Sequence, residues 1–368
     1  ESKSILFANF FKGSPWGGFS LDEIRGLMFF TTGNPEYWNV GVDRPGDNLY
    51  ANSVVAFDLN NKNIRWHFQE ISHDLWNMDV AAPPILTTVK KGKQDIDVVV
   101  AVTKLGNTLI LDRETGESLF DIKKVKAPTS NVPGEKTSPY QLAIDLPEPI
   151  CRNKMTLDEL SDLPYVNKDR LNKIFYESET GFPSPPKIGI KSIQIAACVR
   201  WSGATVDTKK NILYVNTDQQ PGFVSIVKNP GWPGTYTSKW ENFTDEKNYP
   251  AIKPPWGSIV SLDLNTGKIL WKIPFGEWED LSKLNINKTG TYNRSGITAS
   301  RGNLIFASGT QDNQFTVIDS LTGEELWKYK MTHPGSAPPL IFTHKEKQYV
   351  IIPAFEEGGK KIYAFSLK

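Results

Sequence analysis

The sequence predicts an all-β chain of radially arranged four-stranded sheets, which is a β-propeller. Two observations favour this fold. One turn pattern recurs four times, and short apolar runs typical of strands surround each copy. Neighbouring copies are one blade apart, since 54 residues separate Trp66 from Phe120 and 56 separate Trp271 from Trp327. We expect a single propeller domain over residues 1–368, because a chain of this length suffices for one large domain.

The recurring pattern places an aspartate eight residues before an aromatic residue. One strand ends at the aspartate, a Thr-Gly turn or its equivalent reverses the chain, and the next strand carries the aromatic side chain. Such a sheet cannot bury both faces alone, so we expect blades to stack with the aromatic between neighbours. A stacked β-solenoid would show the same periodicity and is the alternative. The four pairs are Asp58 and Trp66, Asp112 and Phe120, Asp263 and Trp271, and Asp319 and Trp327.

The remaining elements complete about five visible blades. Phe120 and Trp271 are 151 residues apart, so we expect a long irregular insertion at about 121–190 on one face of the propeller. Within it, Thr156 to Glu159 resembles a capping box that would open a short helix reaching Phe175. A second irregular stretch is expected at 229–256. Further strands are expected at 211–216, 258–262, 302–309, 348–354 and 361–366.

Composition excludes several classes of protein. The chain has 42 basic and 41 acidic residues, a net charge of +1, and no basic stripe that would favour nucleic acid or anionic membranes. No apolar run approaches the roughly 20 residues of a membrane-spanning helix. Residues 1–7 lack the pattern of a signal peptide, so we expect either a mature protein or a fragment.

The two cysteines, Cys151 and Cys198, have no cysteine neighbours. This excludes zinc-ribbon, CxxC redox and CxxCH haem motifs. Two alternatives stay open. The residues are either buried free thiols or one disulfide that closes a long loop, which would imply an oxidising compartment.

Several motifs together resemble the pyrroloquinoline-quinone (PQQ) dependent dehydrogenases. The resemblance rests on residues 32–35 (TGNP), 44–50 (RPGDNLY), 66–69 (WHFQ) and 73–76 (HDLW). Residues 132–136 (VPGEK) and 309–312 (GTQD) are similar to the membrane glucose and quinate dehydrogenase branch. The resemblance implies an eight-bladed propeller, of which this chain is similar to the C-terminal part. It also implies PQQ and calcium on the axis, a periplasmic location, and electron transfer to a quinone or cytochrome.

The resemblance assigns roles to individual residues. Trp16 would stack under PQQ, since a flat cofactor needs an aromatic floor. Asn34 would bind the metal through its amide oxygen. Lys104 would face the quinone oxygen and stabilise negative charge there. Arg200 and Trp201 would line the cofactor. The alternatives are a core tryptophan, an ordinary turn asparagine and a solvated lysine.

Asn77 departs from the family, which has an aspartate there as metal ligand and proton acceptor. An asparagine still offers an oxygen to calcium but accepts no proton. Asp79 lies two residues on, and in an extended strand both side chains would face the same side. Asp79 is therefore a candidate substitute base, a candidate metal ligand with a lanthanide in place of calcium, or a solvated carboxylate.

These observations favour a PQQ- and metal-dependent enzyme that oxidises a hydroxyl of an alcohol, sugar or polyol. Asn77 predicts impaired activity, and the family's upstream glutamate ligand and vicinal-cysteine loop do not precede Trp16. The alternative is a degenerate, non-catalytic propeller that acts as a protein-binding scaffold. A scaffold would not need the TGNP and HDLW motifs or Lys104, so their presence favours the enzyme.

Overall fold

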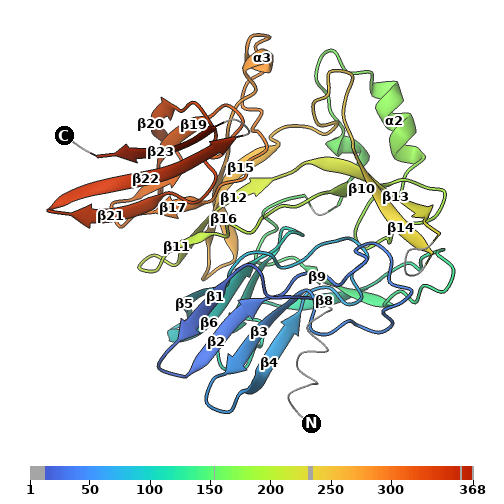
Figure 1. Ribbon diagram of the computed structural model, residues 1–368, viewed down its shortest axis with the longest axis horizontal. Coiled ribbons are helices and arrows are strands. Elements are labelled where there is room, and N and C mark those ends of the chain that lie inside the picture. The colour runs from blue at the N-terminus through green and yellow to red at the C-terminus, as the bar shows by residue number, and fades with distance from the viewer. Residues whose placement is uncertain (1–12, 153, 231–234, 357–358, 367–368) are drawn as a thin grey trace. The chain divides into compact units, whose positions relative to one another are not determined.

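A computed structural model describes residues 13–152, 154–230, 235–356 and 359–366. Residues 1–7, to which the expectation about a signal peptide applies, lie outside them. Within the described residues the chain is almost entirely β-sheet, with three short helices (Figure 1). These helices are η1 (Leu157–Glu159), α2 (Lys168–Tyr176) and α3 (Glu279–Ser282). None of them has the length and apolarity that crossing a bilayer requires.

Three antiparallel sheets have four strands, and neighbouring strands in each follow one another in the chain or nearly so. The first contains β1 (Phe19–Asp22), β2 (Leu27–Thr31), β3 (Ser53–Asp58) and β4 (Asn63–Gln69). The second contains β11 (Thr205–Asp207), β12 (Ile212–Asp218), β15 (Gly257–Asp263) and β16 (Lys268–Pro274). The third contains β17 (Ile297–Ala299), β18 (Leu304–Ala307), β19 (Gln314–Asp319) and β20 (Glu325–Lys330).

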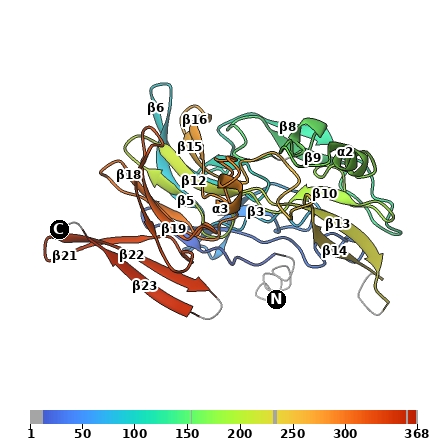
Figure 2. The same cartoon turned by 90° about the horizontal axis from the view of Figure 1, so that it is seen from above.

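The other sheets of the described chain are smaller. Figure 2 shows the long strands β22 (Lys347–Glu356) and β23 (Gly359–Phe365), which pair along their length. One three-stranded sheet contains β5 (Ile85–Lys91), β6 (Gln94–Val102) and β7 (Thr108–Asp112). Another contains β10 (Ser192–Ile195), β13 (Pro221–Lys228) and β14 (Tyr236–Asn242). The last has β21 (Leu340–His344), β22 (Lys347–Glu356) and β23 (Gly359–Phe365), and β8 (Ile122–Lys126) pairs with β9 (Tyr140–Ile144).

The chain divides into two compact units. The first comprises Glu1–Leu86, Val99–Cys198 and Gln220–Lys253, and the second comprises Thr87–Val98, Val199–Gln219 and Pro254–Lys368. Each has its own apolar core. In the first unit Phe29, Val54 and Leu109 lie among the buried side chains of one cluster, and in the second Tyr214 and Ile259 belong to another.

The repeated hairpins are confirmed. In each copy the aspartate caps the turn, because its side chain accepts backbone N–H groups two or three residues on. Where the fourth residue after the aspartate is a glycine, as Gly116 is after Asp112, its N–H donates to the backbone carbonyl of the aspartate. Gly116 has a φ of +77°, which favours glycine. Sequence therefore predicted the local turn correctly.

The repeated aromatics are equivalent only in part. The Trp66 indole donates to the Arg113 carbonyl at 3.1 Å and covers Gly116 of the next turn. Trp271 does the same in the second unit, donating to the Ser320 carbonyl at 3.1 Å and covering Gly323. A side chain at either glycine would press on the indole, so turn and aromatic depend on each other.

The other two repeat positions have different surroundings. Trp327 occupies the same strand register but packs on Phe315 and Phe365 and is 45% exposed. Phe120 follows a single β-bridge between Leu111 and Ser118 in place of a full fourth strand. Full equivalence of all four aromatics was therefore wrong. The all-β class with four-stranded sheets is confirmed, whereas ring closure and the number of blades remain predictions.

Two local expectations were wrong. The Thr156 side chain caps no helix, and the helix begins at Lys168 after Asn167, whose side chain accepts the Arg170 N–H. The stretch 229–256 is less irregular than expected, because β14 within it pairs with β13; residues 231–234 lie outside the described residues. The single domain and the insertion at about 121–190 remain predictions, although β8, β9 and α2 show that 121–190 contains regular structure.

Candidate functional site

The TGNP turn follows β2 and lies against the segment that carries Trp16. Gly33 donates its N–H to the Ser14 carbonyl at 3.0 Å. A side-chain carbon at Gly33 would lie 3.1 Å from the Trp16 indole nitrogen, so the indole lies directly on this turn. Trp16 is 49% exposed, which contradicts the alternative of a core tryptophan. Asn34, half-buried in the same turn, donates to the Pro35 carbonyl at 3.1 Å.

A buried carboxylate organises the HDLW loop. Asp74 accepts the Trp76 N–H at 2.7 Å and the Met78 N–H at 2.9 Å. It also accepts the side-chain amide of Asn52 at 2.9 Å, and the Asn52 N–H donates to the Gly33 carbonyl at 3.0 Å. Burial raises the pKa of Asp74, although these hydrogen bonds oppose the rise. Asn52 thus joins this loop to the turn that carries Asn34.

Asn77 lies in this loop and not in the strand that we expected. Its φ is +60°, and no strand covers Asn77 or Asp79. The physical reason is Asp74, which captures the N–H groups on both sides of Asn77 and curls the backbone. The alternation of a strand therefore does not apply to Asn77 and Asp79. Among the described residues, the half-buried amide of Asn77 makes no hydrogen bond.

Asp79 is buried and paired with Lys104. Its carboxylate lies 2.5 Å from the Lys104 ammonium, and the two side chains are 4% and 15% exposed. Neither the solvated carboxylate nor the solvated lysine is therefore correct. Lys104 keeps its cation in place, but an anionic ligand would share that cation with Asp79.

Lys104 lies on a tight turn above a second buried acid. Thr103 and Asn107 close the turn through their backbone groups at 3.0 Å. Both side chains donate to one carboxylate oxygen of Glu70, at 2.9 Å and 2.8 Å. Burial raises the pKa of Glu70 from 4.5 to about 7 against the effect of these two hydrogen bonds. The base of the Lys104 turn is therefore held by hydrogen bonds from two neutral side chains, Thr103 and Asn107, to the buried carboxyl group of Glu70.

A disulfide joins Cys151 and Cys198, which decides between the two alternatives for the cysteines. It lies beside the same turn. Cys198 donates its N–H to the Lys104 carbonyl at 2.8 Å, and Ile150 donates to the Gly106 carbonyl at 2.9 Å.

The opposite side of the HDLW loop is held by the buried pair of His73 and Glu135. The His73 ring nitrogens lie 2.7 Å from the Gly46 carbonyl and 2.7 Å from the Glu135 carboxylate. The Gly46 carbonyl can only accept, so Nδ1 donates to it, and Nε2 faces the Glu135 carboxyl group. Burial alone would raise the pKa of Glu135, but hydrogen bonds from His73 and from the Gly41 N–H lower it below its usual value. The RPGD and VPGEK motifs are therefore joined through His73.

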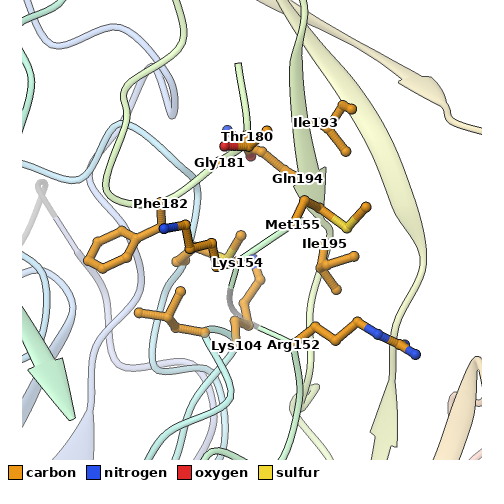
Figure 3. Close-up of a pocket in the computed structure, with 12 residues that line it drawn as sticks. Lys104, Arg152, Lys154, Met155, Thr180, Gly181, Phe182, Ile193, Gln194 and Ile195 are labelled. Atoms are coloured by element: carbon orange, nitrogen blue, oxygen red, sulfur yellow. The ribbon is translucent and has the colours of Figure 1, made fainter. Parts of the chain in front are cut away.

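A small pocket adjoins Lys104 (Figure 3). Apolar groups such as Met78, Leu105 and Phe182 line it together with Gln194, whose amide nitrogen is buried without a partner among the described residues. Figure 3 shows the Arg152 guanidinium pointing away from the pocket, where it pairs with Glu159. Lys104, Lys154 and Thr180 contribute polar groups to the same lining.

Arg200 and Trp201 belong to the second unit. Arg200 donates twice to one oxygen of Asp218, at 3.1 Å and 2.9 Å. Its guanidinium lies 4.7 Å from the centre of the Tyr292 ring and 5.8 Å from that of Trp201. Burial raises the pKa of Asp218 to about 7, and Arg200 and Arg294 oppose the rise. This unit therefore holds an arginine and aromatic cluster that suits a flat anion.

Sequence reasoning missed the residues that support the site. Asp74 belongs to the HDLW motif but received no role, and its spacing to Met78 was the available signal for a capped loop. Asn52, Glu70 and Asp218 had no signal, because their contacts join residues 18 to 37 positions apart.

In the first unit a series of contacts links the segments that carry the four candidate residues. The Trp16 indole lies on the turn of Asn34, Asn52 joins that turn to the Asn77 loop, and Asp79 of that loop pairs with Lys104. An exposed indole and a partly buried cation fit a flat anionic cofactor. A hard cation fits less well. Asn34 and Asn77 offer amide oxygens, but the candidate carboxylate Asp79 already pairs with Lys104. In the described parts of the chain no group of three His, Cys, Asp or Glu side chains could hold a metal ion.

Comparisons with known proteins agree with this chemistry. The family described as "PQQ: Glucose/ethanol/alcohol dehydrogenase, beta-propeller domain" matches residues 9–350. The quinoprotein glucose dehydrogenase of Escherichia coli (strain K12) is 26% identical, with 96% of this chain and 49% of that protein aligned. A protein of Xanthomonas campestris pv. juglandis named "Probable quinate dehydrogenase (quinone)" is 25% identical over 96% of this chain and 49% of its own length.

A solved structure shares the fold. The europium-containing methanol dehydrogenase superposes with a TM-score of 0.63 over 94% of this chain and 51% of that one, at 19% identity. The chain thus spans about half the length of the curated relatives it matches.

Proposed function

This chain belongs to the PQQ-dependent glucose, ethanol and alcohol dehydrogenase family of β-propellers, and we propose that it binds PQQ in the oxidation of a hydroxylated substrate. The substrate class is an alcohol, sugar or polyol, and the electron acceptor is a quinone or a cytochrome. The observation that carries the proposal is the meeting of the Trp16, Asn34, Asn77 and Lys104 segments in one unit. A merely structural propeller needs no such meeting.

The chain's own residues would divide the work as follows. The Trp16 indole would form the floor under the flat cofactor, and Lys104 would face its negative charge. Asn34 and Asn77 would offer amide oxygens to a calcium ion or a lanthanide. When bound, PQQ with such an ion supplies an electrophilic quinone that takes two electrons from the substrate. The family resemblance also assigns Arg200 and Trp201 to the cofactor.

The proton acceptor is the weak point of this site. The Asn77 amide cannot hold the proton that leaves the substrate hydroxyl. The Asp74 carboxylate is taken up by backbone N–H groups on both sides of Asn77, and Lys104 occupies one oxygen of Asp79. We therefore propose a slow enzyme, in which the loss of the general base costs about 10²–10⁴-fold in rate.

A titration of PQQ with calcium into the protein, followed by tryptophan fluorescence, tests cofactor binding. We expect quenching that Trp16→Phe removes. Trp240→Phe is the matched control, because Trp240 is similarly exposed, at 43% against 49%, and lies on β14. The absence of quenching, or quenching that both variants retain, would contradict the proposal.

Turnover of the loaded protein tests the acceptor. Restoring the carboxylate in Asn77→Asp should raise kcat by about 10²–10⁴-fold, and Asp79→Asn should then change little. If Asp79 has become the base, Asp79→Asn should abolish turnover and Asn77→Asp should add little. Restored metal-dependent PQQ binding in Asn77→Asp without turnover would mean that another part of the site limits the reaction. High wild-type turnover that Asp79→Asn leaves intact would refute the argument.

The location that we propose is the periplasm. The Cys151–Cys198 disulfide supports an oxidising compartment.

A protein-binding scaffold is the second candidate. Large apolar side chains are exposed on the last two sheets, among them Trp327 at 45%, Phe355 at 47% and Ile362 at 71%. The PQQ titration separates the two candidates, because a degenerate propeller would not quench through Trp16.

A further inference from the structure

The turn that carries Lys104 lies between the two chain segments that the disulfide joins. On one side Cys198 donates its N–H to the Lys104 carbonyl at 2.8 Å, and on the other Ile150 donates to the Gly106 carbonyl at 2.9 Å. At Gly106, whose φ is +93°, a side-chain carbon would lie 3.0 Å from the Cys151 Cβ. The disulfide therefore packs directly on the turn and flanks both of its carbonyl anchors.

The two anchoring segments are distant in sequence. Cys151 and Cys198 are 47 residues apart, and their Cα atoms are 5.8 Å apart. The disulfide is their direct covalent link, so it fixes the separation between the two N–H groups that hold the turn. The ammonium of Lys104 extends from this turn to Asp79 at 2.5 Å, a contact that depends on where the turn is placed.

We propose that the Cys151–Cys198 disulfide is a positioning element for Lys104, which it keeps opposite Asp79. The placement of Lys104 is a property of the free chain, and only its catalytic consequence depends on the proposed function. Both cysteines are buried, at 6% and 1% exposure. The disulfide is therefore a permanent brace, since a reductant reaches it slowly. Reduction by a dithiol would pass two electrons to the sulfurs, break the S–S bond and leave two protonated thiols, while the dithiol becomes a cyclic disulfide.

The direct test measures the chemical accessibility of Lys104 in the full chain without cofactor. The double variant Cys151→Ser, Cys198→Ser is treated with a limiting acetylating reagent, and each lysine is quantified by peptide mass spectrometry. Because Lys104 is 15% exposed and paired, we expect it to react several-fold faster once the brace is absent. Lys123, which is 69% exposed, is the internal reference and should not change. An unchanged Lys104 rate would overturn the proposal.

A matched variant separates positioning from general loosening. Leu171→Ala removes a fully buried side chain of α2 in the same unit without touching the turn. It should lower the melting temperature yet leave Lys104 labelling unchanged. If Leu171→Ala accelerates Lys104 as much as the serine pair does, the disulfide is merely stabilising and the proposal is wrong.

A second variant approaches the turn from its other side and serves if the serine pair does not fold. Gly106→Ala places a methyl group against Cys151 and strains a positive φ, so it should also free Lys104. An unchanged Lys104 rate in Gly106→Ala would count against the proposal. In protein loaded with PQQ and calcium, the serine pair should lower kcat with little change in KM. If wild type binds no PQQ, the proposed function fails, whereas the labelling result still decides the role of the disulfide.

Discussion

Glu70 and Glu135 are both glutamates with buried side chains in the first unit, but their environments shift their pKa values in opposite directions. Glu70 accepts two neutral donors, Thr103 and Asn107, and burial raises its pKa to about 7. Burial would raise the pKa of Glu135, but hydrogen bonds from the His73 ring and the Gly41 N–H outweigh burial and lower it. Burial alone therefore does not set the pKa of a buried carboxyl group, because its hydrogen-bond partners also contribute and can outweigh burial.

The difference has a consequence for the two loops of the candidate site. Glu70 lies under the turn of Lys104, whereas Glu135 holds the HDLW loop through His73. Folding favours the protonated form of Glu70, because burial dominates, and the ionised form of Glu135, because its hydrogen bonds dominate. The candidate site should therefore weaken at both ends of the pH scale, for different reasons at each end.

The largest effect is expected for Glu135→Gln, which removes the carboxylate partner of the buried His73 ring. His73 is 1% exposed, so we expect a loss of about 3–5 kcal/mol in the free energy of unfolding at pH 7. Urea unfolding measures it. The pair stabilises the fold above the ordinary pKa of a glutamate, 4.5, and this contribution disappears as pH falls through the lowered pKa. Glu135→Gln should not show that loss of stability at acidic pH. If the variant loses as much stability in acid as wild type does, the assignment is wrong.

Glu70→Gln should act in the opposite direction. Because the folded pKa is raised, wild type binds more protons folded than unfolded, so its stability falls as pH rises from 4.5 to about 7. The fall amounts to about 3 kcal/mol, and Glu70→Gln should abolish it. The variant keeps an acceptor oxygen for Thr103 and Asn107, so it should match wild type at pH 5 and exceed it at pH 8. Unfolding curves at both pH values decide this, and parallel pH profiles would refute it.

Local features of this fold could be predicted from the sequence, whereas features set by distant contacts could not. The Asp-to-aromatic spacing predicted the hairpins, because an aspartate that caps its own turn is a local signal. It also predicted equivalent packing for Trp66 and Trp271, which each lie on the next turn, but not the different surroundings of Trp327. The loop at Asn77 looked like a strand, because the sequence does not reveal that the Asp74 carboxylate captures backbone N–H groups.

Long-range pairing explains the rest of what was missed. The motifs assigned Trp16, Asn34 and Lys104 to one site. Trp16 does lie on the turn that carries Asn34, and the place of Lys104 in that site stays a prediction. Nothing in the spacing of Asp79 and Lys104, 25 residues apart, indicated that they form an ion pair. The same is true of Glu70 beneath Asn107, 37 residues on. Such contacts depend on how sheets bring loops together, which periodicity does not specify.

The smallest stability effect is expected for Asp79→Asn, and it makes the comparison sharper. Lys104 is 15% exposed and has a flexible stem, so it can turn its charge toward water when Asp79 is neutral. We therefore expect a loss of only about 1–2 kcal/mol in the free energy of unfolding, less than for the enclosed His73 pair.

The affinity for the cofactor should instead increase in Asp79→Asn. PQQ carries carboxylates, and removing the negative charge beside Lys104 removes both a competitor for that cation and a repulsive partner for the cofactor. Asp79→Asn should thus bind PQQ several-fold more tightly in the fluorescence titration, while Asp145→Asn, at the exposed pair with Lys123, should leave affinity unchanged. Weaker binding in Asp79→Asn would mean that Asp79 holds Lys104 in the orientation the cofactor needs, and that the ion pair is part of the binding site rather than a competitor to it.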